Sequence, residues 1–364
     1  MGSFGFIIHP ISVSDVNRRF PMAKIFPEGL VEMGMSLLPP FKVSHITGVE
    51  SRHGKAHGWF VTCPLTPRLM MGWPEARVMK KIIRAGQIAR DLGAKIVGLG
   101  AFTSVVGDAG ITIRQNLDIA VTTGNSYTAG TALEATERAA GLMGINMDEA
   151  NVLVLGASGA IGKVLSIIMA DKGRHLTLCA RDQGRLNRVA RDITERTGMV
   201  PRVTRDLKGS LGRADVVVCV SSALDSLIEP ADLKPGALVC DVSRPRSVSW
   251  EVKRCRDDVL VIEGGVVKVP GKVDFGFNFG FPPGHSYACM AETMILALEE
   301  DYCDWSLGRD LSLERVMGIG RLAKKHGFEV AGFRSFERLV SEEEISKIRE
   351  NARRRQGLIG RAGT

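Results

Sequence analysis

One cysteine of the sequence stands where a helix is expected to begin. Cys289 follows a Pro-Pro-Gly break in the stretch PPGHSYACMAETM, and the pattern after it predicts a helix from about Ser286 to Glu300. With Ser286 as the N-cap, the thiol would occupy the third helical position, where the partial positive charge of the helix end lowers a thiol pKa. Cys289 is therefore a candidate nucleophile. The alternative is a small buried residue on an amphipathic helix.

A histidine close by offers a second candidate group. His285 lies four residues before Cys289 and would share its face if the helix began earlier, giving a thiol–imidazole pair. The alternative is a surface histidine beside a turn.

A glycine-rich turn suggests dinucleotide binding. Residues 151–162 read NVLVLGASGAIG, which predicts a strand, three glycines at spacing G-x-x-G-x-x-G, and then a helix. Such glycines let the chain turn sharply, bring backbone N–H groups to a pyrophosphate and pack the helix closely. A tight structural turn is the alternative. The residues predicted to contact the cofactor here are Gly156, Ser158, Gly159, Ala160, Ile161 and Gly162.

The end of the next predicted strand bears on the choice of cofactor. NAD-binding proteins usually carry an acidic residue there for the ribose hydroxyls, but the strand HLTLCA runs into Arg181. An arginine suits a 2′-phosphate, so we expect NADPH, although Asp182 keeps NADH open. Ser221 and Ser222 follow the strand VVVCV, where they would either line the nicotinamide side or cap the following turn.

The elements needed to position these residues form an α/β protein. Six short apolar runs alternate with helical segments after residue 150, which predicts a Rossmann-type doubly wound parallel sheet. We expect residues 1–130 to form a smaller α/β substrate domain, residues 131–284 the dinucleotide-binding domain, and residues 285–364 a helical segment that returns to the first domain. Helices are predicted over 75–92, 128–143 and 313–326, and a strand over 95–99.

Composition narrows the class of protein. The chain has 364 residues, a net charge of +8 and 45% hydrophobic residues. It shows no apolar run long enough to cross a bilayer, no signal-peptide pattern and no nucleic-acid motif, so a cytoplasmic protein is expected. The seven cysteines show no close pairing and suggest reduced thiols. No metal site is predicted.

Several stretches together resemble one known family, the long-chain acyl-[acyl-carrier-protein] reductases, which form fatty aldehydes. The matching stretches, in the order of that family, are GAFTS at 100–104, TTGNSYTA at 122–129, GASGAIG at 156–162, Ala180-Arg181 with Arg185-Leu186, GGVV at 264–267 and ACMAE at 288–292.

The resemblance implies a reaction and its partners. In that family the cysteine corresponding to Cys289 accepts the acyl group from an acyl thioester, and NADPH then reduces the enzyme-bound thioester to an aldehyde. The substrate would be carried by acyl carrier protein or coenzyme A, and an enzyme that consumes the aldehyde would act downstream. The hydroxyl and amide groups of Thr103, Ser104 and Asn125, together with His285, are candidate substrate contacts.

One segment departs from the family and two other readings stay open. The stretch 268–287 is rich in glycine and phenylalanine; its alternating Phe275, Phe277, Phe279 and Phe281 could contact an acyl chain or form an ordinary buried strand. The domain order also resembles shikimate-dehydrogenase-type enzymes, which act on small hydroxy or keto acids through a lysine–aspartate pair. Lys80 and Lys81 lie at no predicted strand end, so that pair has no counterpart here. A non-catalytic NADPH-binding regulator is the remaining alternative.

Overall fold

The structure, a computed structural model, describes residues 1–173 and 175–362; the side chains of residues 18, 19 and 359–362 lie outside the description. The chain forms two compact units. Unit 1 comprises Met1–Tyr127 with Val267–Glu329, and unit 2 comprises Thr128–Val266 with Val330–Thr364.

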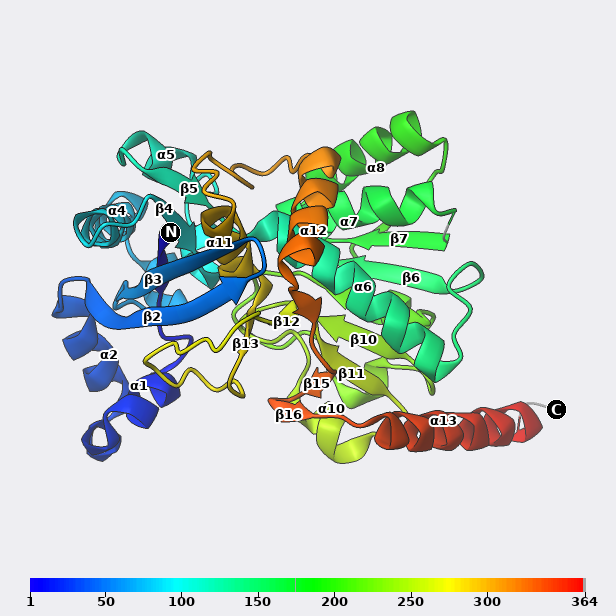
Figure 1. The fold of residues 1–364 in the computed structure, drawn as a ribbon. Coiled ribbons are helices and arrows are strands. Elements are labelled where there is room, and N and C mark those ends of the chain that lie inside the picture. Colours follow the sequence, from blue (N-terminus) through cyan, green and yellow to red (C-terminus); the bar gives the residue numbers. More distant parts are fainter. Residues whose placement is uncertain (174, 363–364) are drawn as a thin grey trace. The chain divides into compact units, whose positions relative to one another are not determined.

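Unit 1 is built on a five-stranded sheet of order β2-β3-β1-β4-β5 (Figure 1). Strands β3, β1, β4 and β5 run parallel, and only β2, at the edge, is antiparallel to its neighbour. The carboxyl ends of β1, β4 and β5 therefore meet at one edge of the sheet. The bounds are β1 Gly2–Ile8, β2 Phe41–Ser51, β3 Gly54–Thr62, β4 Ile96–Leu99 and β5 Ala120–Thr122.

Helices cover both faces of this sheet. Helix α4 (Glu75–Asp91) packs on one face and helix α11 (Ala288–Leu298) on the other. Side chains alternate along β1 as expected for a strand buried on both faces: Phe6 belongs to the core under α11 and Ile7 to the core under α4. The other elements are α1 Val13–Arg19, η1 Pro21–Ile25, α2 Glu28–Leu37, α3 Pro67–Gly72, η2 Ala101–Ser104, α5 Ile111–Gln115, β13 His285–Tyr287 and α12 Leu313–His326.

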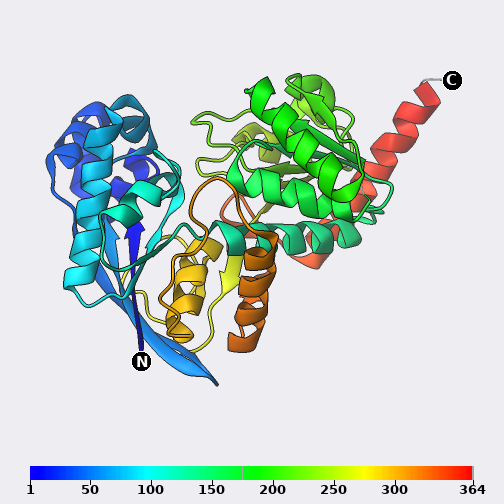
Figure 2. The same ribbon diagram turned by 90° about the horizontal axis from the view of Figure 1, so that it is seen from above.

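Unit 2 is a six-stranded parallel sheet of order β11-β10-β9-β6-β7-β8. The order reverses between β6 and β9, which is the point where doubly wound sheets bind dinucleotides. Helices α7 and α8 pack against each other beside β7, as the green ribbons of Figure 2 show. The strands are β6 Asn151–Leu155, β7 His175–Cys179, β8 Arg202–Thr204, β9 Val216–Cys219, β10 Leu238–Asp241 and β11 Leu260–Glu263. The helices are α7 Ala160–Asp171, α8 Gln183–Thr197, α9 Leu207–Leu211, η3 Pro230–Asp232 and α10 Trp250–Cys255.

The predicted elements are confirmed where their patterns were local. All six strands of unit 2 lie in the predicted runs, and α12 has the predicted bounds. Helix α6 (Asn125–Met143) begins three residues earlier than expected. The chain passes between the units within α6, β12 (Val266–Lys268) and β14 (Glu329–Val330).

The two units divide the end of the chain differently from the predicted domains. Residues 267–284 belong to unit 1, because the segment around Phe275 packs in its core, and residues 330–364 belong to unit 2. There the hairpin β15 (Arg334–Ser335) and β16 (Arg338–Leu339) is followed by helix α13 (Glu342–Ala362). Arg355 of α13 pairs with Asp257 at 2.8 Å, which ties this helix to the Rossmann sheet.

Candidate functional site

Three loops of unit 1 converge at the carboxyl ends of neighbouring parallel strands. His9 follows β1, the turn GAFTS follows β4, and the turn TTGN follows β5. Ligands of open parallel sheets bind at such strand ends. The first turn of α11, with Cys289, lies at the same place: the Cα of Cys289 is within 2.3 Å of where a Cβ on Gly124 would lie.

The surroundings of Cys289 differ from the expectation in two ways. Tyr287, not Ser286, is the N-cap of α11, so Cys289 is the second helical residue. The prediction of a lowered thiol pKa is wrong, because desolvation of the half-buried Cys289 raises its pKa to about 12. Nearby backbone N–H groups, among them those of Met290 and Ala101, act on the pKa in the opposite direction and favour the thiolate. The resting sulfur is therefore a thiol at neutral pH.

Gly124 allows the TTGN turn to approach the cysteine. Its φ of 72° lies in the left-handed region, and an added Cβ would be 2.4 Å from the Cβ of Cys289. Both the conformation and the space exclude a side chain at this position. The sequence pattern TTGN thus reports a close contact as well as a turn.

A buried carboxyl group ties the TTGN turn to α11. Glu292, one turn after Cys289, accepts hydrogen bonds from Thr122 Oγ1 at 2.5 Å, Ser306 Oγ at 2.7 Å and the Tyr127 amide at 2.7 Å. Burial raises the pKa of Glu292, and these hydrogen bonds oppose the shift. Sequence reasoning missed this residue. Its position three residues after the cysteine in ACMAE was the available signal.

The other predicted substrate contacts are placed as follows. Thr103 Oγ1 donates to the Gly100 carbonyl and Ser104 Oγ to the Ala101 carbonyl, both at 2.7 Å, so these hydroxyls stabilise their own turn. Asn125 is the half-buried first residue of α6. His285 lies in strand β13 rather than on α11, and its Nδ1 donates to the Pro283 carbonyl at 2.9 Å. Helical spacing therefore does not join His285 to Cys289.

The phenylalanine-rich segment forms an aromatic cluster in unit 1 instead of a strand. Phe275 stacks on Phe60 of β3 with ring centroids 6.0 Å apart, and Phe279 meets Phe275 edge-on at 5.0 Å. The cluster continues to Phe281, whose ring contacts Tyr287 at 4.6 Å. Tyr287 is the N-cap of α11 and lies two residues before Cys289. The aromatic cluster therefore extends to the start of the helix that carries this thiol.

In unit 2 the glycine turn joins β6 to α7 beside the end of β9. An added Cβ on Gly156, whose φ is 89°, would lie 2.7 Å from the Val220 carbonyl, so this turn closely contacts the backbone that follows β9. Gly159 is the N-cap of the twelve-residue helix α7. The first-turn amides of Ala160, Ile161 and Gly162 lack intrahelical acceptors as in any helix, and the helix end carries partial positive charge. This arrangement fits a dinucleotide pyrophosphate.

Asp182 and Arg181, the two residues expected to distinguish NADH from NADPH, differ in their surroundings. Asp182 is the N-cap of α8: its Oδ1 accepts from the Arg185 amide at 3.0 Å, and its other oxygen lies 3.3 Å from the Arg185 guanidinium. Arg181, directly after β7, is exposed. The carboxylate of Asp182 is thus already used by its own helix, while the neighbouring arginine side chain extends from the strand end.

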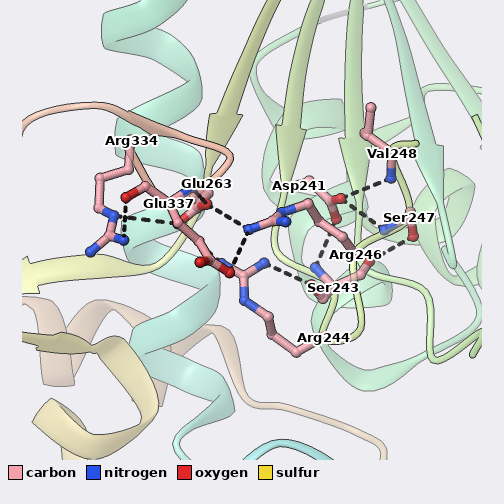
Figure 3. Close-up of polar contacts among 9 residues, drawn as sticks. All are labelled: Asp241, Ser243, Arg244, Arg246, Ser247, Val248, Glu263, Arg334 and Glu337. Atoms are coloured by element: carbon pink, nitrogen blue, oxygen red, sulfur yellow. Dashed lines mark hydrogen bonds and ion pairs between the residues drawn. The ribbon is translucent and has the colours of Figure 1, made fainter. Parts of the chain in front are cut away.

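The serines after β9 belong to a hydrogen-bonded set of loops. Ser221 Oγ accepts from the Ala223 amide at 3.1 Å, which is the turn-capping alternative, and the Ser221 amide donates to Ser243 Oγ at 3.1 Å. Ser222 is exposed. Asp241, at the end of β10, accepts from the amides of three residues of the following loop (Figure 3). The three amides, all within 3.1 Å, are those of Ser243, Ser247 and Val248.

A second carboxylate organises the outer side of that loop. Glu263, at the end of β11, pairs with Arg246 at 3.0 Å and Arg244 at 3.5 Å, and accepts from the Glu337 amide at 2.7 Å (Figure 3). Burial alone would raise the pKa of Glu263, but the arginines, including Arg334 of the hairpin β15–β16, hold it below its usual value. The hairpin and the β10–α10 loop are therefore fixed by one buried group. Sequence reasoning did not identify this network.

The described residues contain neither a membrane-spanning helix nor a cluster of metal ligands. Within residues 1–173 and 175–362, no helix combines the length and apolarity needed to span a bilayer. The same part of the chain has no group of three or more histidine, cysteine or acidic side chains that could hold a metal ion.

Comparison with known proteins first defines the class. Residues 137–262 match the family model for shikimate / quinate 5-dehydrogenase, which covers most of the parallel sheet of unit 2. A solved structure, the dipicolinate synthase A chain from Bacillus subtilis, is 14% identical, covers 72% of this chain and 88% of its own, and superposes with a TM-score of 0.34. The protein is an NAD(P)-dependent reductase with a Rossmann-type domain.

The relatives then define the family. The chain is 30% identical over 349 residues to the long-chain acyl-[acyl-carrier-protein] reductase of Synechococcus elongatus, covering 90% of this chain and 98% of that protein. It belongs to the long-chain acyl-[acyl-carrier-protein] reductase family. It is also 30% identical over 365 residues to aminotransferase PigE of Serratia sp., where the match covers 95% of this chain and 42% of the longer protein.

Proposed function

We propose that this protein reduces a long-chain acyl thioester to a fatty aldehyde, using NADPH and an acyl intermediate on Cys289. The observation that carries the proposal is the place of Cys289: a thiol in the first turn of α11, packed against the TTGN turn that follows β5. A relative of nearly the same length bears the name of this activity.

The proposed chemistry has two balanced steps. In the first, the sulfur of Cys289 bonds to the acyl carbon, the bond from that carbon to the carrier sulfur breaks, and the proton lost by Cys289 is regained by the carrier thiol. NADPH, when bound, would supply a hydride. In the second step the acyl carbon gains that hydride, its bond to the Cys289 sulfur breaks, and one proton returns the sulfur to the thiol as the aldehyde leaves. Covalent capture divides a difficult displacement into two and lets the carrier depart before reduction.

The environment of Arg181 supports NADPH over NADH. A ribose 2′-hydroxyl needs a free carboxylate, but Asp182 is occupied as the N-cap of α8. The guanidinium of Arg181 could pair with a 2′-phosphate through charge-assisted hydrogen bonds. The predicted cofactor contacts in the glycine turn and at Ser221 and Ser222 remain part of this proposal.

Two features support an acyl thioester as substrate. The aromatic cluster from Phe60 to Phe281 offers an apolar surface that leads to Tyr287, two residues before Cys289. The net charge of +8 favours an acidic carrier such as acyl carrier protein, although coenzyme A carries the same reactive bond. Against the shikimate-type alternative, Lys81 donates to the carbonyls of Ser36 and Leu38 at 2.7 and 2.6 Å, so it ties α2 to α4.

The deciding experiment is the intact mass of the protein after incubation with a long-chain acyl thioester and no NADPH, beside Cys289→Ala. We expect one acyl group on the parent protein, none on the variant, and release of aldehyde when NADPH is added. A protein that binds NADPH but gains no acyl mass would contradict the proposal. In that case turnover of small hydroxy and keto acids would indicate a dehydrogenase.

A further inference from the structure

One part of unit 1 exposes many apolar side chains. Nine of the nineteen large apolar side chains that are exposed in the described part of the chain fall within residues 20–41, a segment that contains η1 and α2. Met22, Ile25 and Leu37 are the most exposed of the nine, at 76%, 77% and 74%. Single apolar side chains at a protein surface are ordinary, but a concentration of them marks an interaction site.

Helix α2 turns its apolar face outward. Leu30, Met33 and Leu37 lie at helical spacing on one face, and all three are exposed. On the opposite face, Ser36 is buried and Glu32 accepts a hydrogen bond from the side chain of the N-cap of α3. A surface helix of a globular protein usually has the reverse arrangement, so the outer face of α2 is suited to an apolar partner.

Contacts within unit 1 fix this orientation of α2. Lys81 of α4 donates to the carbonyls of Ser36 and Leu38, at 2.7 and 2.6 Å, and so holds the end of α2. The N-cap of α3 holds the middle of α2 through Glu32. Helix α1 packs against both η1 and α2, as the blue ribbons of Figure 1 show. The apolar face therefore stays outward in the folded protein.

The segment around η1 extends the apolar face. None of the five residues of η1 is buried, and the side chains of Phe20, Met22, Ile25 and Phe26 are all more than half exposed. Removing side chains of this size from water is favourable in proportion to their apolar area. A partner that covers η1 and the outer face of α2 together would therefore be bound more strongly than one that covers either alone.

The chain around these side chains is basic. Residues 1–100 contain thirteen lysines and arginines and six acidic residues, so they carry +7 of the net charge of +8. Lys24 lies within η1, Lys42 directly follows Phe41, and Arg68 lies in α3; all three cations are exposed. Exposed apolar side chains interleaved with cations are typical of segments that lie in the interface of an anionic membrane.

We propose that residues 20–42 of unit 1 bind the surface of an anionic lipid bilayer, with the apolar side chains in the interfacial layer and Lys24 and Lys42 at the lipid phosphates. A second copy of the chain fits this surface less well, because a two-fold contact would bring like cations together. A transient protein partner also fits less well, since such interfaces are only about as apolar as ordinary protein surface. The inference does not rest on the proposed function.

The test measures co-sedimentation of the full chain with vesicles, made either of equal amounts of phosphatidylcholine and phosphatidylglycerol or of phosphatidylcholine alone. A triple serine variant removes apolar side chains around η1, and its control removes three exposed apolar side chains of unit 2. The triple serine variant is Met22→Ser with Ile25→Ser and Phe26→Ser, and the control is Val200→Ser with Leu339→Ser and Leu358→Ser. For the charge, Lys24→Glu with Lys42→Glu is compared with Lys208→Glu and Lys324→Glu, which lie at exposed positions elsewhere.

We expect the parent protein and the unit 2 control to bind the anionic vesicles, and the triple serine variant to bind them roughly 100-fold more weakly, because three large side chains no longer leave water. Lys24→Glu with Lys42→Glu should weaken binding to anionic vesicles by roughly tenfold or more, and its control by much less. On phosphatidylcholine alone the two lysine changes should have little effect. Thermal unfolding should stay the same, since all the substituted side chains are exposed.

Several results would overturn the inference. They are no binding of the parent protein to anionic vesicles, or equal binding by the parent and the triple serine variant. Self-association without vesicles that the triple serine variant abolishes would assign the surface to a second copy of the chain instead. Loss of a complex with acyl carrier protein, in place of vesicle binding, would assign it to a protein partner. Acyl uptake by Cys289, measured without vesicles, tests the proposed function separately and should be the same in the parent and the triple serine variant.

Discussion

The Cys289 site of unit 1 and the glycine turn of unit 2 both lie where parallel strands end, but they are constructed in opposite ways. The glycine turn uses one continuous stretch, residues 156–162, that presents backbone amides at a helix end. The Cys289 site uses loops after β1, β4 and β5 together with α11, which comes more than 150 residues later. The glycine turn presents partial positive charge that suits an anionic ligand, and the TTGN turn of unit 1 packs against Cys289.

The electrostatics differ accordingly. In unit 2, an exposed arginine and a helix end would meet phosphate groups near solvent. In unit 1, the sulfur of Cys289 is desolvated, and this burial, together with the charge of Glu292, raises its pKa to about 12. Under the proposed function, the glycine turn of unit 2 would bind a charged ligand, and the Cys289 site of unit 1 would keep its sulfur uncharged until the reaction begins.

The variant Cys289→Ala should have the largest effect, and this effect should be confined to the Cys289 site. We expect thioester reduction to fall by roughly 10³-fold or more, because a covalent nucleophile cannot be replaced by the methyl group. NADPH affinity, measured by fluorescence or calorimetry, should stay within a factor of about two because the glycine turn is untouched. Equal loss of NADPH binding would show that the two sites are not independent.

The second prediction concerns the pH at which Cys289 becomes reactive. With a thiol pKa raised to about 12, iodoacetamide alkylation of Cys289 should increase by about tenfold per pH unit from pH 7 to 10, without a plateau. Peptide mass spectrometry follows Cys289, with the exposed Cys255 as an internal reference for reagent access. A plateau near neutral pH would mean that the thiolate already exists in the resting protein.

The third prediction compares two glycines: Gly124 directly precedes α6, and Gly141 lies within this helix. Gly124→Ala should destabilise unit 1 by roughly 3 kcal/mol and stop acylation, because the new methyl would lie 2.3 Å from the Cα of Cys289 at a φ of 72°. Gly141→Ala in α6 has nothing within 4 Å of the added Cβ and should stabilise the protein by about 0.5–1 kcal/mol. Urea unfolding of both variants measures the contrast. Similar stability of the two would contradict the close packing of TTGN on α11.

The smallest expected effect distinguishes the two nicotinamide cofactors. Arg181→Ala should weaken NADPH binding by about 10- to 100-fold, the value of one charge-assisted contact, and leave NADH binding nearly unchanged. Arg196→Ala, in the last turn of α8, is the control of equal charge. The KM for each cofactor is the measurement; an equal change for both would move the 2′-phosphate away from Arg181.

The glycine turn comes from one continuous stretch, whereas the Cys289 site combines segments far apart in the chain. This difference explains what the sequence could and could not predict. The strands of unit 2, the glycine turn and helix α12 follow from local patterns, because each needs only neighbours along the chain. Cys289 was found as a helix-start thiol, yet the direction of its pKa was wrong, because desolvation depends on packing that no local spacing reports. Glu292 and the Asp241–Glu263 network were missed for the same reason: Thr122, which donates to Glu292, lies 170 residues away along the chain, and Glu337, which donates to Glu263, lies 74 residues away.

The desolvated thiol of Cys289 also has a consequence for oxidative damage. Peroxide attacks thiolates, and at a pKa of about 12 only about one sulfur in 10⁵ is ionised at neutral pH. The proposed nucleophile would then be oxidised only slowly to the sulfenic and sulfinic acids that inactivate cysteine enzymes. A thiol that stays protonated between reaction cycles resists oxidation by peroxide.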